Sequence, residues 1–189
     1  LYQIIFNILK HKDNYEYYDQ MMDAMDKLPE VLVDVKYKTE ERANEFAEKY
    51  QDSEYFMVLG AGPLWGMAYT YATCILEEMQ WIHAQPVHSG EYFHGAFEIV
   101  RENTNIILFK GEDRTRPLAE RAEKFSQKYS DNLILIDSKD YELAGISEKF
   151  RGYFSHLVIS SIMDVFSKKI ADKRDHPLET RKYMGKVDY

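Results

Sequence analysis

The sequence predicts an α/β protein with a doubly wound parallel sheet and additional helices at its N-terminal end. Three short apolar runs carry this prediction, because each has the length and continuous hydrophobicity of a strand buried on both faces. Segments with helical periodicity separate these runs, which is typical of parallel βαβ units. The three expected strands are Tyr55–Leu59, Asn105–Phe109 and Asn132–Asp137.

The N-terminal segment Leu1–Leu28 has apolar residues at helical spacing, with a break expected near Lys12–Asn14. Pro29 is expected to end this helical segment, since proline removes a backbone donor. A second helix is expected over Thr39–Tyr50, where Thr39 can act as its N-cap and acidic residues follow in the first turn.

Further helices are expected between and after the strands. Pro63–Trp81 has the pattern of one long amphipathic helix, followed by a loop over residues 82–89 around Pro86. Ser89 is expected to cap a short helix, Gly90–Val100. The remaining expected elements are helices over Arg116–Tyr129 and Gly152–Lys173 and a polar loop over 138–148.

Composition excludes several classes of partner. The 189 residues carry a net charge of −8, whereas nucleic-acid binders concentrate Lys and Arg, so no nucleic acid is expected as a partner. No apolar run approaches the ~18 residues of a membrane span, so no membrane is expected either. Cys74 is the only cysteine, so a reducing, cytoplasmic location is expected. The chain begins LYQIIFNILK, without Met and already in helical periodicity, so we expect it to start inside a longer protein.

A glycine-rich turn, GAGPLWG, follows the first expected strand (Gly60–Gly66). Such a turn places backbone N–H groups at the carboxyl edge of the sheet, where ligands bind in doubly wound folds. Its GxGxxxG spacing differs from the dinucleotide fingerprint, and it lacks the Lys-Ser/Thr of a P-loop. The turn is therefore either a tight connection that needs small residues or one wall of a site, with Gly62 and later Ser89 as candidate substrate contacts.

Three histidines, His83, His88 and His94, fall close together after the long helix. Their spacing does not match a helical metal pair and no cysteine accompanies them, so no metal is expected. Glu78 and His94 suggest different chemistry, because a carboxylate and an imidazole brought to one edge of a sheet can act as base and acid. The simpler alternative is a solvated glutamate at a helix end and an incidental histidine.

The C-terminal segment LETRKYMGKVDY carries Arg181, Lys182 and Lys186 beside two tyrosines. It is either a frayed terminus or an ordered tail that closes a site and binds an anionic substrate.

Three motifs resemble those of sugar isomerase (SIS) domains, and among these the fructosamine-6-phosphate deglycases, especially members acting on 6-phosphofructose-aspartate. They are AGPL (Ala61–Leu64), SGE-x-x-HG-x-x-EIV (Ser89–Val100) and R-x-Y-x-G-x-V-D-Y (Arg181–Tyr189). The resemblance runs from about residue 37 to the end. It implies a flavodoxin-like SIS domain, the second of a tandem pair, over 37–174. Residues 1–36 would be a helical connector and 175–189 a tail closing the active site.

The resemblance also implies a reaction. Such enzymes split a phosphorylated Amadori sugar, a 6-phosphofructosyl amino acid, with water into glucose 6-phosphate and the free amino acid. They use no cofactor and assemble as homodimers with shared sites. Glu78 falls on the family's general base and His94 on its general acid. Aspartate as the released amino acid would call for a cation such as Arg181, Lys182 or Lys186.

Two departures from the wider superfamily refine this expectation. Ile75 stands where amidotransferase-type isomerases carry a lysine, which disfavours an amine-donating synthase. No Ser/Thr-rich phosphate loop is present, so phosphate-binding residues are expected in a preceding domain and this chain is expected to be inactive alone. A phosphosugar isomerase and a non-catalytic phosphosugar-binding domain remain the alternatives.

Overall fold

A computed structural model describes residues 1–188 and contains one parallel sheet of four strands in the order β2–β1–β3–β4. Every neighbouring pair runs parallel, and the register aligns the starts and ends of β1 and β2. The doubly wound parallel class predicted from the sequence is confirmed. The strands are β1 (Tyr55–Gly60), β2 (His83–His88), β3 (Ile106–Lys110) and β4 (Leu133–Asp137).

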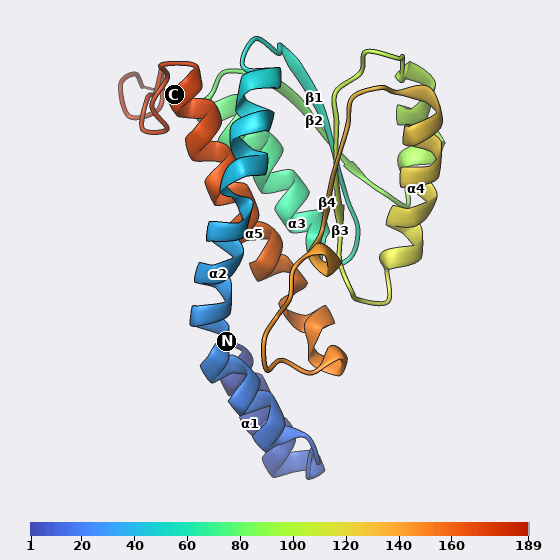
Figure 1. Cartoon of the computed structure of the whole chain (residues 1–189), viewed down its shortest axis with the longest axis vertical. Helices are drawn as coiled ribbons and strands as arrows, with labels where there is room; N and C mark the ends of the chain where they lie inside the picture. Colours follow the sequence, from blue (N-terminus) through green and yellow to red (C-terminus); the bar gives the residue numbers. More distant parts are fainter. Residues whose placement is uncertain (189) are drawn as a thin grey trace.

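The central strands β1 and β3 are buried on both faces, and their successive side chains point alternately into two cores. In β1, Phe56 and Val58 belong to the larger core, while Met57 and Leu59 belong to the smaller one. Figure 1 shows the consequence: α2, α3 and α5 cover one face of the sheet and α4 covers the other. The covering helices are α2 (Tyr18–Tyr50), α3 (Pro63–Thr70), α4 (Arg116–Tyr129) and α5 (Glu148–Lys173).

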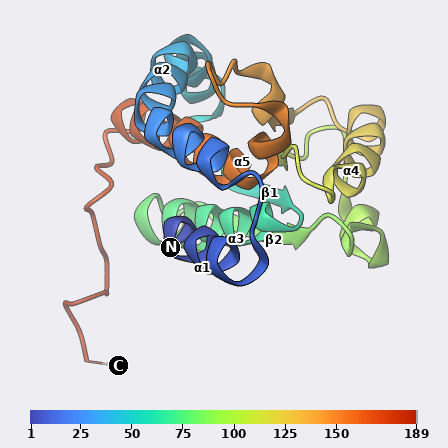
Figure 2. The ribbon, with the colours of Figure 1, turned by 90° about the horizontal axis from the view of Figure 1, so that it is seen from below.

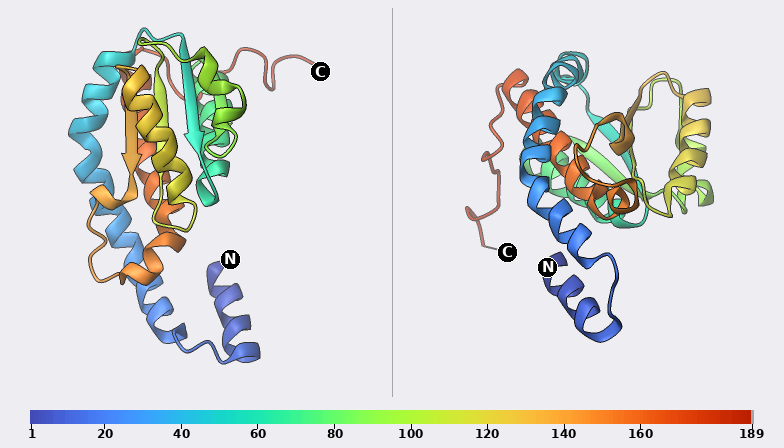
Figure 3. Two further views of the ribbon diagram at one scale, coloured as in Figure 1. Left: turned by 90° about the vertical axis from the view of Figure 1, so that its right-hand side faces the viewer. Right: turned by 60° about the horizontal axis from the view of Figure 1, so that its bottom comes forward.

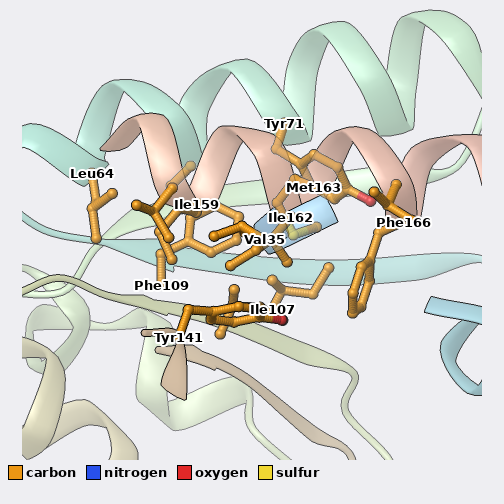
Figure 4. Close-up of a cluster of buried hydrophobic side chains, with 14 of the residues drawn as sticks. Val35, Leu64, Tyr71, Ile107, Phe109, Tyr141, Ile159, Ile162, Met163 and Phe166 are labelled. Atoms are coloured by element: carbon orange, nitrogen blue, oxygen red, sulfur yellow. The ribbon is translucent and has the colours of Figure 1, made fainter. Parts of the chain in front are cut away.

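The larger core fills the space between the sheet and the helical layer. Figure 4 shows side chains of α2, α3, α5 and β3 interlocking there, with Tyr71 among Ile162, Met163 and Phe166. Helix α5 is apolar around most of its circumference because it packs on α2, on α3 and on the sheet. This central position makes it the scaffold of the layer.

The N-terminal helices differ from the expectation at Pro29. The expected break is present, since α1 (Tyr2–Asp13) ends at Asn14 in the left-handed conformation. However, α2 continues through Pro29 and includes the expected helix Thr39–Tyr50. The buried stripe of α2 keeps helical spacing on both sides of this proline and packs on α5. We attribute the tolerance to this burial, which outweighs the ~3 kcal/mol that an interior proline costs. The expected connector boundary at 36/37 falls inside α2.

Residues 82–89 are the second main correction. This segment was expected to be a loop, but it contains the edge strand β2, in which Pro86 lies opposite Val58. An edge strand tolerates proline where the missing N–H would point away from the sheet. After β2, two short 3-10 turns, Tyr92–His94 and Ala96–Ile99, replace the helix expected over Gly90–Val100.

The expected helix Pro63–Trp81 is also modified. It begins as α3 and continues as a π-helix, η1 (Tyr71–Met79), which carries Glu78 near its end. π-helical geometry is rare and is found frequently at functional sites. The loop expected over 138–148 contains one 3-10 turn, Ser138–Asp140, and α5 begins earlier than expected, at Glu148.

The segments at both ends of the chain extend beyond the sheet. Figure 3 shows α1 and the start of α2 as a hairpin that projects past it. Figure 2 shows the segment after α5 running away from the helical layer as an extended tail. Tyr189, the last residue of the tail motif, lies outside the described residues. Within residues 1–188, none of the helices combines the length and apolar character that crossing a bilayer requires.

Candidate functional site

The candidate residues form two groups at opposite edges of the sheet. Glu78 and the tail lie near the edge where the strands begin, because η1 ends just before β2 starts at His83. Gly62, Ser89 and His94 lie at the edge where the strands end, since they follow β1 and β2. Strand β2 alone spans about 17 Å at the usual rise per residue.

Glu78 is held by the C-terminal tail. Its Oε1 lies 2.9 Å from Nη2 of Arg181, and the two side chains are 26% and 20% exposed. The other terminal nitrogen of Arg181 donates to the carbonyl oxygens of Leu178 and Thr180, at 2.7 and 3.0 Å. The guanidinium is thus fixed by the fold of the tail and presented to one carboxylate.

The first part of the tail is anchored to the end of η1. Gln80, which is fully buried, donates from Nε2 to the carbonyl of His176 at 2.8 Å, and the His176 ring meets Trp81 edge-on at 4.5 Å. Arg174 donates to the carbonyl of Gln51 at the end of α2. The tail is therefore ordered as far as Arg181 by contacts with the body of the domain.

The other tail cations project into solvent. Lys182 is exposed and its ammonium lies over the ring of Tyr183, while Lys186 is exposed and donates to the carbonyl of Arg181. Neither lies against Glu78 in an ion pair. Of the three cations predicted as substrate contacts, the structure brings Arg181 to the predicted base and leaves the other two outside.

A groove of about 740 Å³ runs beside Arg181, between α3–η1 and α5. It extends from Pro63 at one end to Arg181 at the other, and most of its wall is apolar. Two polar atoms are buried at its lining residues without a hydrogen-bond partner among the described residues: Tyr71 Oη and His156 Nδ1. Burial raises the pKa of Tyr71 and lowers that of His156, so it favours the neutral form of both side chains.

His94 stands on a rigid turn at the opposite edge. Its Nδ1 lies 2.8 Å from Oε2 of Glu91, and its backbone N–H donates to the Glu91 carbonyl. The turn is anchored by Tyr92, which is fully buried, with its hydroxyl 3.2 Å from that of Ser126. His94 and Glu91 themselves are 71% and 70% exposed, so a surface outside this chain can reach them.

Gly62 and Ser89 have structural roles at this edge. Gly62 adopts φ 53°, and a Cβ there would meet the Thr115 side chain at 2.5 Å. Ser89 donates its backbone N–H to the Gly60 carbonyl at 2.9 Å. Its hydroxyl is buried and has no partner within residues 1–188, and it does not cap a helix as expected. The Ser89 backbone thus ties the end of β2 to the end of β1, and the missing side chain of Gly62 lets the turn after β1 approach Thr115.

An ion-pair cluster occupies the same edge at the ends of β3 and β4. Asp137 accepts from both terminal nitrogens of Arg116, at 2.9 and 2.6 Å, and lies 3.1 Å from Lys110. Lys110 also pairs with Glu123 at 2.7 Å. Burial acts to raise the pKa of Asp137, but these cations hold it below its usual range. The cations are neutralised internally and give no free anion site here.

The chain was compared with known proteins. No family model matches it. It is 38% identical over its full length to the fructosamine deglycase of Bacillus subtilis, of which it spans 58%. It is 26% identical over its full length to the fructoselysine 6-phosphate deglycase of Escherichia coli O157:H7, spanning 54% of that protein. The chain thus spans about half the length of the curated relatives it matches.

Superposition on solved structures identifies the fold family of this chain. The chain superposes with a TM-score of 0.93 on a candidate phosphosugar isomerase from Bacillus subtilis, at 38% identity over the whole chain and 57% of that protein. This chain has the SIS domain fold. At 16% identity it also superposes, with a TM-score of 0.66, on the C-terminal domain of the glucosamine-fructose-6-phosphate aminotransferase from Francisella tularensis, over 87% of the chain and 47% of that structure. The resemblance to SIS-domain deglycases is confirmed, since the chain is homologous over its full length to proteins named as fructosamine and fructoselysine 6-phosphate deglycases. The finer resemblance to members acting on 6-phosphofructose-aspartate stays a prediction.

This SIS domain does not bring Glu78 and His94 together within one chain. They lie at opposite edges because β2, which was expected to be a loop, carries the chain along the whole length of the sheet between them. The expectation that active sites are shared between two subunits stays a prediction. The histidines are separated likewise, with His83 at the start of β2 and His88 at its end. No group of three metal-ligating side chains is assembled anywhere in residues 1–188.

Sequence reasoning gave Glu91 no role. The signal that could have revealed it is its i, i+3 spacing from His94, which lets two side chains meet on a helical turn. Chemically, the domain offers an arginine-held carboxylate on one surface and a carboxylate-held imidazole on another.

Proposed function

We propose that this chain is the C-terminal SIS domain of a deglycase that splits a 6-phosphofructosyl amino acid with water. The products are glucose 6-phosphate and the free amino acid. The proposal is supported by full-length similarity to proteins named as fructosamine and fructoselysine 6-phosphate deglycases. The observation that carries it within the structure is the Arg181-held carboxylate of Glu78 beside an open groove.

The proposed chemistry needs one base and one acid. His94 protonates the ring oxygen as the sugar ring opens to a C2 ketone. Glu78 then removes a proton from C1. The electron pair forms the C1=C2 double bond, the C2 carbonyl double bond opens, and the C2 oxygen takes a proton, which gives the enaminol. Reprotonation at C2 gives a C1 imine, and water adds at C1 while the C1–N bond breaks and the amine leaves with a proton. The bond cleavages and the water addition are each accompanied by a proton transfer, which side chains of these types support.

Two copies of the protein would complete each site. Within one chain, the length of β2 separates Glu78 from His94. His94 is exposed on its turn, so a second copy can bring its imidazole to the Glu78 of the first. A symmetric dimer makes this exchange reciprocal and forms two equal sites.

Mixing two inactive variants of the full-length enzyme tests both the roles and the sharing. We expect Glu78→Gln and His94→Gln each to lower glucose 6-phosphate release by about 10²-fold or more. After denaturation and refolding together, half of the dimers are mixed, and each mixed dimer has one unaltered site. The mixture should therefore recover about 25% of wild-type activity. Loss in both variants without recovery would place the site within one subunit, and no loss in either would refute the acid–base roles.

The released amino acid is tested separately. We propose 6-phosphofructose-aspartate as the substrate, with Lys182 and Lys186 as the exposed cations available to its carboxylate. Fructoselysine 6-phosphate must be assayed in parallel, because three of the relatives are named as deglycases of that compound. A higher kcat/KM for the aspartate compound, lowered in the Lys182→Ala/Lys186→Ala double variant, is the expected result. A sugar-phosphate product without free amino acid would indicate an isomerase, and binding without turnover would indicate a non-catalytic domain.

A further inference from the structure

The Glu91–His94 pair combines a buried, anchored backbone turn with exposed polar side chains. The backbone of its turn is fixed by Tyr92, which is buried, and by Phe93, which packs on Phe125 at 5.6 Å. The two polar side chains are nevertheless mostly exposed, and apart from the adjoining residues no heavy atom lies within 4 Å of a Cβ added at Gly95 beside them. A rigid turn thus presents one carboxylate and one imidazole outward, already joined by a contact of 2.8 Å.

The Glu91–His94 contact contributes little to the folding stability of the domain. An ion pair or hydrogen bond between side chains that are 70% exposed contributes little, because water competes for both groups. The same contact becomes strong when a protein surface or a substrate covers it and lowers the local dielectric. The pair therefore has its main effect in the assembled site and little effect in the free chain.

We propose that Glu91 is a positioning residue for His94. This inference rests on the proposed acid role of His94. The carboxylate accepts the proton on Nδ1, which fixes the ring orientation and leaves Nε2 directed away from the turn. When the imidazole is protonated, Nε2–H is the donor to the sugar ring oxygen, and Glu91 stabilises the cation without touching the substrate. After transfer, Nδ1 keeps its proton and Nε2 is left as the acceptor, ready to be reprotonated.

A residue that positions His94 must meet three requirements, and Glu91 meets all of them. The partner must be a carboxylate, since only an anion both accepts from Nδ1 and stabilises the imidazolium. It must be one helical turn away, so that the same 3-10 turn fixes both backbones. It must not be engaged elsewhere, and the Glu91 side chain makes no other hydrogen bond or ion pair among the described residues.

Kinetics of Glu91→Gln, Glu91→Asp and Glu91→Ala in the full-length enzyme test the role. We expect Glu91→Gln and Glu91→Ala to lower kcat by roughly 10- to 100-fold, part of the whole acid–base contribution, with KM within about twofold of wild type. Glu91→Asp, which keeps the charge, should recover part of the loss. Glu102→Gln is the matched control, because Glu102 is an exposed glutamate on another loop and its change should leave kcat unaltered.

A spectroscopic readout separates positioning from a structural effect. With 15N-labelled histidine, and with the His94 signals assigned from His94→Gln, the neutral ring should carry its proton on Nδ1 in the wild type. In Glu91→Ala this preference should be lost, while the thermal midpoint stays within about 2 °C. Unchanged kcat in Glu91→Ala, or a tautomer that does not move, would overturn the positioning role. A His94→Gln enzyme with undiminished kcat would overturn the acid role first and Glu91 with it.

Discussion

Arg181 Nη2 lies 2.9 Å from Glu78 Oε1, so the tail reaches back to the carboxylate that the sequence singled out as a base. The same guanidinium is bonded to two carbonyls of its own segment. An arginine with these partners orients a carboxylate along a fixed line, which lysine cannot reproduce with a single ammonium group. We therefore propose that Arg181 orients Glu78, as an alternative to the substrate binding expected from sequence.

Replacing Arg181 distinguishes these two roles. We expect Arg181→Ala in the full-length enzyme to lower kcat by about 10- to 100-fold, because a misaligned base loses part of the orientation that catalysis requires. Arg181→Lys should be intermediate, and Arg101→Ala, at an exposed arginine before β3, should match the wild type. The measurement is the rate of glucose 6-phosphate release at saturating substrate. A raised KM with kcat intact would instead return Arg181 to substrate binding.

Two of the three glycines of the GAGPLWG turn, Gly62 and Gly66, should respond to alanine in opposite directions. Gly62 has φ 53° and its added Cβ would meet Thr115, so Gly62→Ala should destabilise the domain by about 2 kcal/mol or more. Gly66 lies inside α3 with open space around an added Cβ, so Gly66→Ala should stabilise by about 0.5–1 kcal/mol.

Urea denaturation of both glycine variants at neutral pH measures these differences. Equal effects would mean that the turn does not depend on the conformation of Gly62. A neutral Gly62→Ala would show that its φ or the position of Thr115 adjusts without cost.

Asp137 makes stability depend on pH in a defined direction. Its pKa is held below the usual 3.8 in the folded domain, although burial opposes this, because Arg116 and Lys110 favour the charged form. A group with a depressed pKa in the folded state stabilises above its unfolded value, and this contribution is lost as pH falls through the folded value. The wild-type domain should therefore lose this part of its stability below about pH 4.

Asp137→Asn checks the assignment. At pH 7 it should cost about 3 kcal/mol, since it leaves Arg116 and Lys110 without their shared buried partner. Between pH 5 and 3 its stability should fall less steeply than that of the wild type. Asp131→Asn, at an exposed position before β4, is the control and should keep the wild-type slope. Parallel slopes in all three proteins would assign the acid sensitivity to other carboxylates.

The central strands were predictable because burial on both faces requires continuous apolar runs, and β1 and β3 have them. The edge strand β2 was not, since its sequence HAQPVH contains proline and histidines that are tolerated only because one side is unpaired. Strand β2 also determines how far apart Glu78 and His94 lie. A loop would have let Glu78 and His94 approach, whereas a strand holds them at opposite edges. Glu91 contacts His94 because both lie on one 3-10 turn, and Arg181 contacts Glu78 because the tail folds back along η1. Residue spacing alone specifies neither the turn nor the course of the tail.

Pro29 shows how local propensity and tertiary packing compete in α2, and its replacement measures the difference. Pro29→Ala should restore the hydrogen bond to the Met25 carbonyl and remove the clash with that turn, a gain of up to ~3 kcal/mol. The proline also restricts the unfolded chain, which offsets about 0.4–1 kcal/mol of that gain. We therefore expect a net stabilisation of about 1–2 kcal/mol, measured by urea denaturation, with the exposed α2 variant Gln20→Ala near zero. Destabilisation by Pro29→Ala would mean that the proline sets a bend that α2 needs in order to follow α5.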